Sequence, residues 1–219
     1  MNTAGVLTTL HQFRLDEGAE ANGGLVQATN GNLYGTTVIG GNLPCSPNNG
    51  CGVVYSLDVG LGSSVALVRD SGKVGGTGGI LGQGFTGTTS VSLNGTPANF
   101  TVVSDTFIKA TVPAGGTTGP VTVTTPSGTL TSNKVFRVTP QLLSFDPPSG
   151  PVGTQVTITG VSLTQTEGVG FGNRVPAQFT VNSDTQVTAT VPSGAKTGKV
   201  GIETKGGIAI SSGTFTITQ

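Results

Sequence analysis

The acidic residues in the last third of the chain are the first candidates for chemistry. They are Glu167, Glu203, Asp184 and Asp146. Glycoside hydrolysis needs one carboxyl group as acid and a second as nucleophile or base, about 5 to 10 Å apart. Glu167 and Glu203 stand where the first copy of an internal repeat has threonine, as a grafted catalytic site would. Exposed strand positions also accept either residue at little cost, and we favour this second interpretation.

A second acidic group lies near the start of the chain. Asp16, Glu17 and Glu20 crowd into the segment RLDEGAEANGG. A calcium loop needs oxygen ligands at alternating positions around a fixed turn, and this segment has only part of that pattern. We predict no cofactor, with calcium at these three residues as the alternative to a solvated acidic turn.

The two cysteines are close in sequence. Cys45 and Cys51 flank a loop rich in Pro, Asn and Gly, and the only histidine, His11, is remote. Two thiols alone cannot complete a tetrahedral zinc site. We therefore predict a local disulfide, which requires an oxidising compartment. The alternative is two free thiols in a cytosolic loop.

Aromatic residues that could contact a sugar or a protein partner are few. The chain has no Trp and two Tyr, and most of its Phe residues fall at repeated strand positions that predict a core. Phe107 is an exception, because its repeat partner is Gln186. Phe107, Tyr34 and Tyr55 are the candidate ligand-binding residues.

Charge excludes some partners. Ten Lys and Arg residues balance ten Asp and Glu residues, without runs of either sign. A nucleic-acid-binding protein should carry a basic stripe, so we predict no nucleic-acid partner.

No apolar run is long enough to span a bilayer, so we predict no membrane insertion. The opening residues lack a secretory signal, and we expect an extracellular or cell-surface chain whose signal was removed or lies outside this segment.

An internal repeat organises most of the chain. Phe100–Pro140 aligns with Phe179–Gln219 without a gap, and nearly half of the paired residues are identical. The repeating unit of about 78 residues has the length of a domain. Segments such as TQVTITG alternate apolar and polar residues, and Gly, Asn, Asp and Pro separate them. This pattern predicts an all-β chain with two β-sandwiches, at residues 63–140 and 141–219.

The motifs of the repeat resemble those of the IPT/TIG domain. SG.VGT, FG, SDT, ATVP..A.TG and a final F.I occur in the order typical of that family. The resemblance implies immunoglobulin-like sandwiches that act as accessory modules of surface proteins and enzymes. DNA-binding members use basic loops, which this chain lacks. In the first copy Gly78 stands in the place of Val156, and we expect a weaker strand there.

Residues 1–62 resemble a single unit of the GloVer tandem repeats, through the motif at Asn32–Thr37. The resemblance implies a blade-like β-hairpin segment, and one blade cannot bury its own faces. We consider three explanations: a fragment of a longer protein, packing on the neighbouring sandwich, or self-association in which the segment supplies strands to another molecule.

The preferred functional prediction is a non-catalytic extracellular module that serves as a spacer or in adhesion. Its partner would be a polysaccharide or another surface protein. The alternatives are a polysaccharide-directed protein, either a carbohydrate-binding module or a small glycoside hydrolase, and a self-assembling β subunit.

Overall fold

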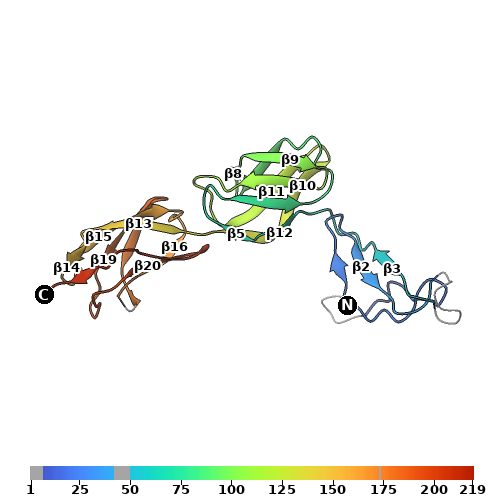
Figure 1. The fold of residues 1–219 in the computed structure, drawn as a ribbon, viewed down its shortest axis with the longest axis horizontal. Helices are drawn as coiled ribbons and strands as arrows, with labels where there is room; N and C mark the ends of the chain where they lie inside the picture. Colours follow the sequence, from blue (N-terminus) through green and yellow to red (C-terminus); the bar gives the residue numbers. More distant parts are fainter. Residues whose placement is uncertain (1–6, 42–49, 173) are drawn as a thin grey trace. The chain divides into compact units, whose positions relative to one another are not determined.

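The computed structural model describes residues 7–41, 50–172 and 174–219 (Figure 1). Throughout these residues the regular elements are strands, with no helix. It follows that the described part holds no helix of the length and apolar character that crossing a membrane requires. The chain forms two compact units, Met1–Ser63 and Ser64–Gln219.

The N-terminal unit contains one small antiparallel sheet in the order β1 (Val26–Gln27), β2 (Leu33–Thr36) and β3 (Val54–Leu57). Tyr55 lies opposite Gly35 in the register, and Tyr34 lies opposite Ser56. Because directly opposed residues share a face and neighbours alternate, the two tyrosines point to opposite faces of the sheet. All buried hydrophobic residues of the described chain lie at Val65 or beyond, so this small sheet has no fully buried apolar core of its own.

Two sandwiches make up the second unit, and each has two facing sheets. In the first sandwich the sheets have the orders β4-β6-β10-β9 and β5-β12-β11-β7-β8. Figure 1 shows this sandwich in green. Its strands are β4 (Ala66–Leu67), β5 (Ser71–Gly72), β6 (Thr77–Leu81), β7 (Ser90–Leu93), β8 (Thr96–Pro97), β9 (Phe100–Ser104), β10 (Phe107–Thr111), β11 (Gly119–Thr125) and β12 (Gly128–Val138).

The second sandwich repeats this arrangement with the sheet orders β13-β15-β19-β18 and β17-β16-β20-β21, and a short parallel pair β14-β22. Its strands are β13 (Gln141–Asp146), β14 (Ser149–Gly150), β15 (Gln155–Val161), β16 (Thr166–Phe171), β17 (Val175–Pro176), β18 (Phe179–Ser183), β19 (Gln186–Thr190), β20 (Val200–Thr204), β21 (Gly207–Ile210) and β22 (Thr216–Ile217). The prediction of an all-β chain with two immunoglobulin-like sandwiches in tandem is confirmed.

Equivalent positions of the two copies fill the two cores. Phe136 and Phe215 are both buried, as are Ile80 and its counterpart Ile158. Phe100 and Phe179 pack against the core of their own sandwich from partly buried positions. The repeated apolar positions are therefore explained by packing, since strand alternation turns each of them inward.

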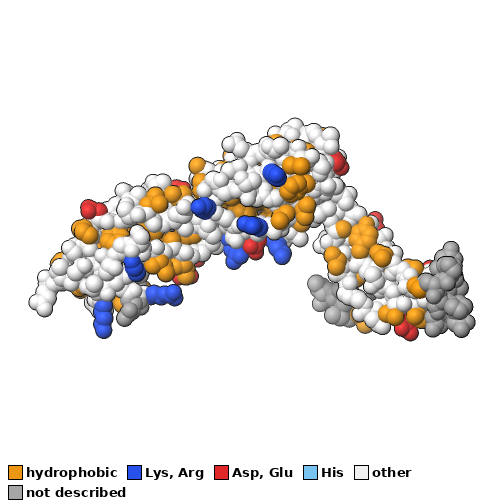
Figure 2. Space-filling model, in the orientation of Figure 1, with side chains coloured by type: hydrophobic (Ala, Val, Ile, Leu, Met, Phe, Trp, Pro, Cys, Tyr) orange, Lys and Arg blue, Asp and Glu red, His pale blue; other side chains and the backbone are white. Residues whose placement is uncertain are grey.

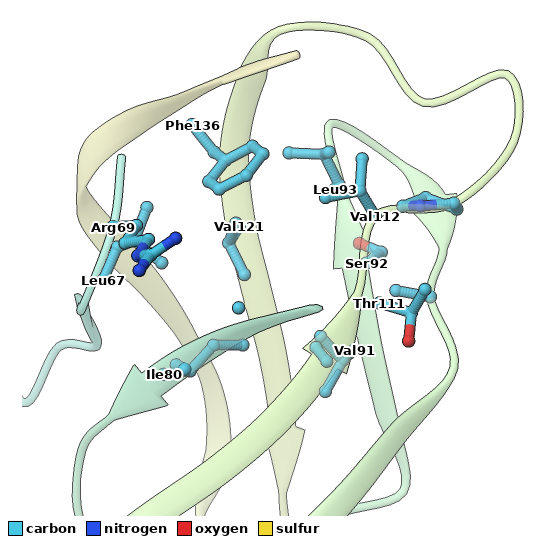
Figure 3. Close-up of a pocket in the computed structure, with 15 residues that line it drawn as sticks. Leu67, Arg69, Ile80, Val91, Ser92, Leu93, Thr111, Val112, Val121 and Phe136 are labelled. Atoms are coloured by element: carbon cyan, nitrogen blue, oxygen red, sulfur yellow. The ribbon is translucent and has the colours of Figure 1, made fainter. Parts of the chain in front are cut away.

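Gly78 leaves a gap in the first core. Strand β6 forms, but Gly78 has no side chain where the second copy has Val156, which is fully buried. A cavity of about 40 Å³ with a mainly apolar lining lies beside Gly78. Figure 3 shows the side chains around it, including Leu67, Ile80, Val91, Leu93, Val121 and Phe136.

We predict that Gly78→Val stabilises the chain by about 1 to 2 kcal/mol, through strand propensity and apolar burial. A Cβ at Gly78 would have no heavy atom within 4 Å. The measurement is urea unfolding followed by circular dichroism. Gly79→Val is the matched control, because a Cβ there would lie 2.7 Å from the Phe107 ring, and we expect it to destabilise the chain. Equal effects of the two substitutions would contradict this account of the cavity.

Candidate functional site

Asp184 fixes a loop between strands. Its carboxylate accepts hydrogen bonds from the hydroxyl of Thr164 at 2.8 Å and from the backbone N–H of Thr164 at 3.4 Å. Asp105 holds the equivalent loop of the first sandwich through Thr86 and the backbone N–H of Gly84. The occurrence of the same arrangement in both copies explains the repeated SDT motif by loop geometry.

Glu167 and Glu203 lie on paired strands, β16 and β20. Glu203 is opposite Gly168, and Glu167 falls at the register shift between Thr166 and Gly168. Both glutamates are exposed, and Asp146 is exposed at the end of β13. The structure therefore brings Glu167 and Glu203 to neighbouring strands of one sheet, and places Asp146 in the other sheet of that sandwich.

Glu203 lies in a shallow groove of about 310 Å³ on the outer face of sheet β17-β16-β20-β21. Figure 2 shows hydrophobic side chains, with Lys and Arg side chains beside them, over this part of the second sandwich. We call this surface the outer groove and define it by its outward-facing residues Gly168, Gly170, Arg174, Pro176, Lys199, Gly201, Glu203, Ile208 and Ile210.

Glycines form the floor of the outer groove. Gly170 is opposite Gly201, and Gly201 is opposite Ile210 in the next strand. Ile208 and Ile210 are 55% and 56% exposed, which is unusual for isoleucine on a strand. The surface is thus low along β16 and β20 and bordered by apolar side chains on β21.

The first sandwich has a different outer face at the same place. Where the second copy has Gly and Ile, the first has hydroxyl side chains, and Ser92 and Thr122 form a hydrogen bond of 2.7 Å. Thr124 and Thr129 occupy the positions of Glu203 and Ile208. Of these differences, only the two glutamates are predicted as candidate site residues from the sequence. The loss of outward Ser and Thr was visible in the repeat and would have located the groove.

A second hollow lies in the N-terminal unit. We call it the aromatic hollow. It measures about 520 Å³ and is lined by residues 8–11 together with Phe13, Glu17, Leu25 and Tyr55–Leu57. The Phe13 ring packs edge-on against Tyr55 at 4.6 Å, and His11 against Phe13 at 4.8 Å. One predicted binding residue, Tyr55, thus joins a cluster of rings in a hollow.

The other aromatic candidates lie elsewhere. Tyr34 is on the opposite face of its sheet, where its hydroxyl accepts a hydrogen bond from the side chain of Asn30 at 3.1 Å. Phe107 is partly buried, with its ring close above Gly79 on the outer face of β6 and β10. Its packing over a glycine gives Phe107 a structural role that needs no ligand.

The acidic segment near the start of the chain is only partly tied together. Glu17 contacts His11 at 3.2 Å and accepts a hydrogen bond from the backbone N–H of Arg14. Within residues 7–41, 50–172 and 174–219, no three His, Cys, Asp or Glu side chains form a group that could hold a metal ion, and this includes Asp16, Glu17 and Glu20. The predicted Cys45–Cys51 disulfide stays a prediction, because Cys45 lies outside the described residues.

Comparison with known families identifies the two sandwiches. The family model described as "IPT/TIG domain" matches residues 66–138 and 140–218. The chain belongs to the IPT/TIG domain family. No curated protein matches it. This family match does not extend to residues 1–62, and the GloVer-type unit stays a prediction.

Solved structures that are similar to this chain come from several sources. The surface glycan-binding protein PbSGBP-B of Prevotella bryantii is 17% identical, with a TM-score of 0.47 over 69% of this chain and 41% of that one. SGBP-B from a xyloglucan utilization locus of Bacteroides uniformis is 22% identical, with a TM-score of 0.33 over 70% and 48%. The plexin A4 extracellular region is 20% identical, with a TM-score of 0.36 over 71% and 18%. The chain therefore spans less than half the length of each of these proteins.

Asp105, the loop aspartate of the first IPT/TIG sandwich, should make the stability of the fold depend on pH. The Thr86 hydroxyl and the backbone N–H groups of Thr86 and Gly84 hold the pKa of Asp105 below 3.8. Asp105 therefore stabilises the fold at pH values above 3.8, and this contribution is lost as the pH falls through the lower folded pKa. We expect the stability difference between the parent chain and Asp105→Asn to shrink on acidification, as measured by urea unfolding at several pH values. In Thr86→Val, NMR titration should show the Asp105 pKa moving up towards 3.8; an unchanged pKa would contradict the assigned cause.

Proposed function

We propose that this chain is a non-catalytic module of an extracellular or cell-surface protein, in which two IPT/TIG sandwiches act as a spacer and offer a binding surface. The placement of the candidate carboxylates carries this proposal. Asp184 is engaged in a loop, and Glu167 and Glu203 are exposed on the outside of a sheet. Their surroundings are suited to contact with a partner.

Catalysis by the Glu167 and Glu203 pair would need a different environment. A general acid that works near neutral pH is ordinarily a carboxyl group whose pKa is raised by burial against apolar groups. Both glutamates are exposed, and the groove beside Glu203 is shallow with a glycine floor. None of the described residues around them excludes water from a reacting sugar.

We expect no turnover of soluble polysaccharides or chromogenic esters by the parent chain. The Glu167→Gln and Glu203→Gln variants, run beside it, should be indistinguishable from it. Polysaccharide hydrolysis that is lost in either variant would make the chain a glycoside hydrolase, and ester hydrolysis lost in this way would make it an esterase; either result would overturn the proposal.

Polysaccharide binding is the second candidate function, and the aromatic hollow favours it. Sugar rings present C–H faces that pack on aromatic side chains, and their hydroxyl groups bind carboxylates. Phe13, Tyr55 and Glu17 supply both kinds of group around one hollow. In this case the chain would bind a glycan without cleaving it.

We predict that Tyr55→Ala weakens binding to a responsive polysaccharide about tenfold, since stacking and burial contribute on the order of 1 to 2 kcal/mol. The measurement is affinity electrophoresis or calorimetry with a panel of soluble polysaccharides. Tyr34→Ala is the matched control, because Tyr34 is on the opposite face of the same sheet. Equal losses in both variants would point to disruption of the sheet rather than to a sugar site.

We further propose that residues 1–62 form one GloVer-type unit. Its three-stranded sheet leaves β1 and β3 as edges, and Val26 and Val54 are 69% and 74% exposed there. An exposed apolar edge can pair with a strand of another molecule, which supports self-assembly through this segment as a further alternative.

A further inference from the structure

Two opposite charges of the outer groove lie at the two ends of strand β20. Lys199 directly precedes β20 and Glu203 is near its end, with Gly201 midway between them. Val200 and Ile202 are buried. Because successive strand residues point to opposite faces, Lys199, Gly201 and Glu203 point outward. Four residues of strand place the Cα atoms of Lys199 and Glu203 about 13 Å apart. The Lys199 ammonium donates a hydrogen bond to the backbone carbonyl of Ser212 within its own sandwich. Arg174 adds a second positive charge to the lining.

This order of charges is self-complementary. Consider two copies whose outer grooves face each other, related by a two-fold axis that lies between them. When this axis runs perpendicular to β20 and passes over Gly201, the β20 strands of the two copies run in opposite directions. This axis places Lys199 of each copy over Glu203 of the other. An axis parallel to the strand would instead place Lys199 over Lys199, so opposite charges select the first arrangement.

We propose that the outer groove packs face to face against the same groove of a second copy of this chain, with Lys199 opposite Glu203 in both directions. The proposal deepens the proposed function, because it names the partner of a non-catalytic binding surface. The resulting interface is isologous and closed, so it produces a dimer.

The shape of the groove fits this partner. Gly170 and Gly201 lie side by side on neighbouring strands and present no side chain, so two sheets can approach closely there. Ile210 is opposite Gly201 in the pairing of β20 with β21. Because the axis passes over Gly201 and runs across the strands, Ile210 also lies near the axis and faces Ile210 of the second copy. Dimer formation would cover the exposed Ile208 and Ile210 of the second sandwich in both copies.

The first sandwich serves as an internal comparison. Its equivalent face carries Ser92, Thr122 and Thr124, and the first two are hydrogen-bonded to each other. That face lacks the Lys199 and Glu203 charges, because Pro120 and Thr124 occupy the matching positions. A polysaccharide is a weaker fit to the outer groove, because none of the described residues that line it is aromatic.

The decisive experiment reverses each charge in the full chain and measures association by sedimentation velocity over a micromolar to millimolar range. Lys199→Glu and Glu203→Lys should each weaken dimer formation about tenfold or more, because like charges then face each other. An equimolar mixture of the two variants should dimerise again, since each variant carries the charge that the other lacks. Thr124→Lys, the matched change on the first sandwich, should leave dimerisation unchanged.

Gly201→Val tests the glycine floor without removing a charge. A Cβ at Gly201 meets only the carbonyl oxygen of Ala209, at 3.9 Å, and valine suits a strand. We expect this variant to unfold at a higher urea concentration than the parent and yet to dimerise about tenfold more weakly, because its side chain holds the two sheets apart.

Three outcomes would overturn the dimer. They are a parent chain that stays monomeric across the concentration range, association that is indifferent to all three groove variants, and a mixture of the charge variants that fails to dimerise. Binding of a polysaccharide that Glu203→Lys abolishes in a monomeric parent would assign the groove to a glycan instead. Turnover of polysaccharides by a chain that still dimerises would refute only the non-catalytic function.

Discussion

The structure depends on the two-residue period of its strands, which gives every strand one face towards the core and one towards water. In β20 the inward residues Val200 and Ile202 are buried, and in β11 the inward residues Val121 and Val123 are buried in the same way. The core therefore restricts alternate positions in each copy, because a polar substitution there would lose apolar burial and leave an unpaired polar group.

The outward positions are under no such restriction, and there the two copies differ most informatively. Strand β20 is the counterpart of β11, and the inward residues of both strands are apolar. The outward residues Thr122 and Thr124 of β11 are replaced by Gly201 and Glu203 in β20. The second sandwich thus has a low surface with separated charges, while its inward residues are apolar and buried as in the first. A sandwich can carry different surfaces in this way because its outward residues lie outside the apolar core.

The N-terminal unit illustrates the opposite case. A sheet of three short strands has too little area to bury an apolar layer without a second sheet or further strands. Its order comes instead from polar and local contacts. Thr37, the last residue of the motif that resembles the GloVer repeat, is buried, donates a hydrogen bond to the carbonyl of Ile39 and accepts one from the N–H of Val53. The aromatic rings of Phe13 and Tyr55 close part of one face.

The amino-acid sequence by itself determined the all-β class, the two sandwiches and their core positions, because strand alternation and a long internal repeat are local patterns. The family resemblance and the placement of Phe136 and Phe215 in the cores followed from the same patterns. Only the tertiary structure decided which outward residues meet. Lys199, Glu203 and Ile210 share one face because β16, β20 and β21 pair in a particular register, and that register depends on contacts between strands distant in sequence. For the same reason, the separation of Tyr34 from Tyr55 and the hydrogen bonds between Asp184 and Thr164, twenty residues apart, could not be read from the sequence.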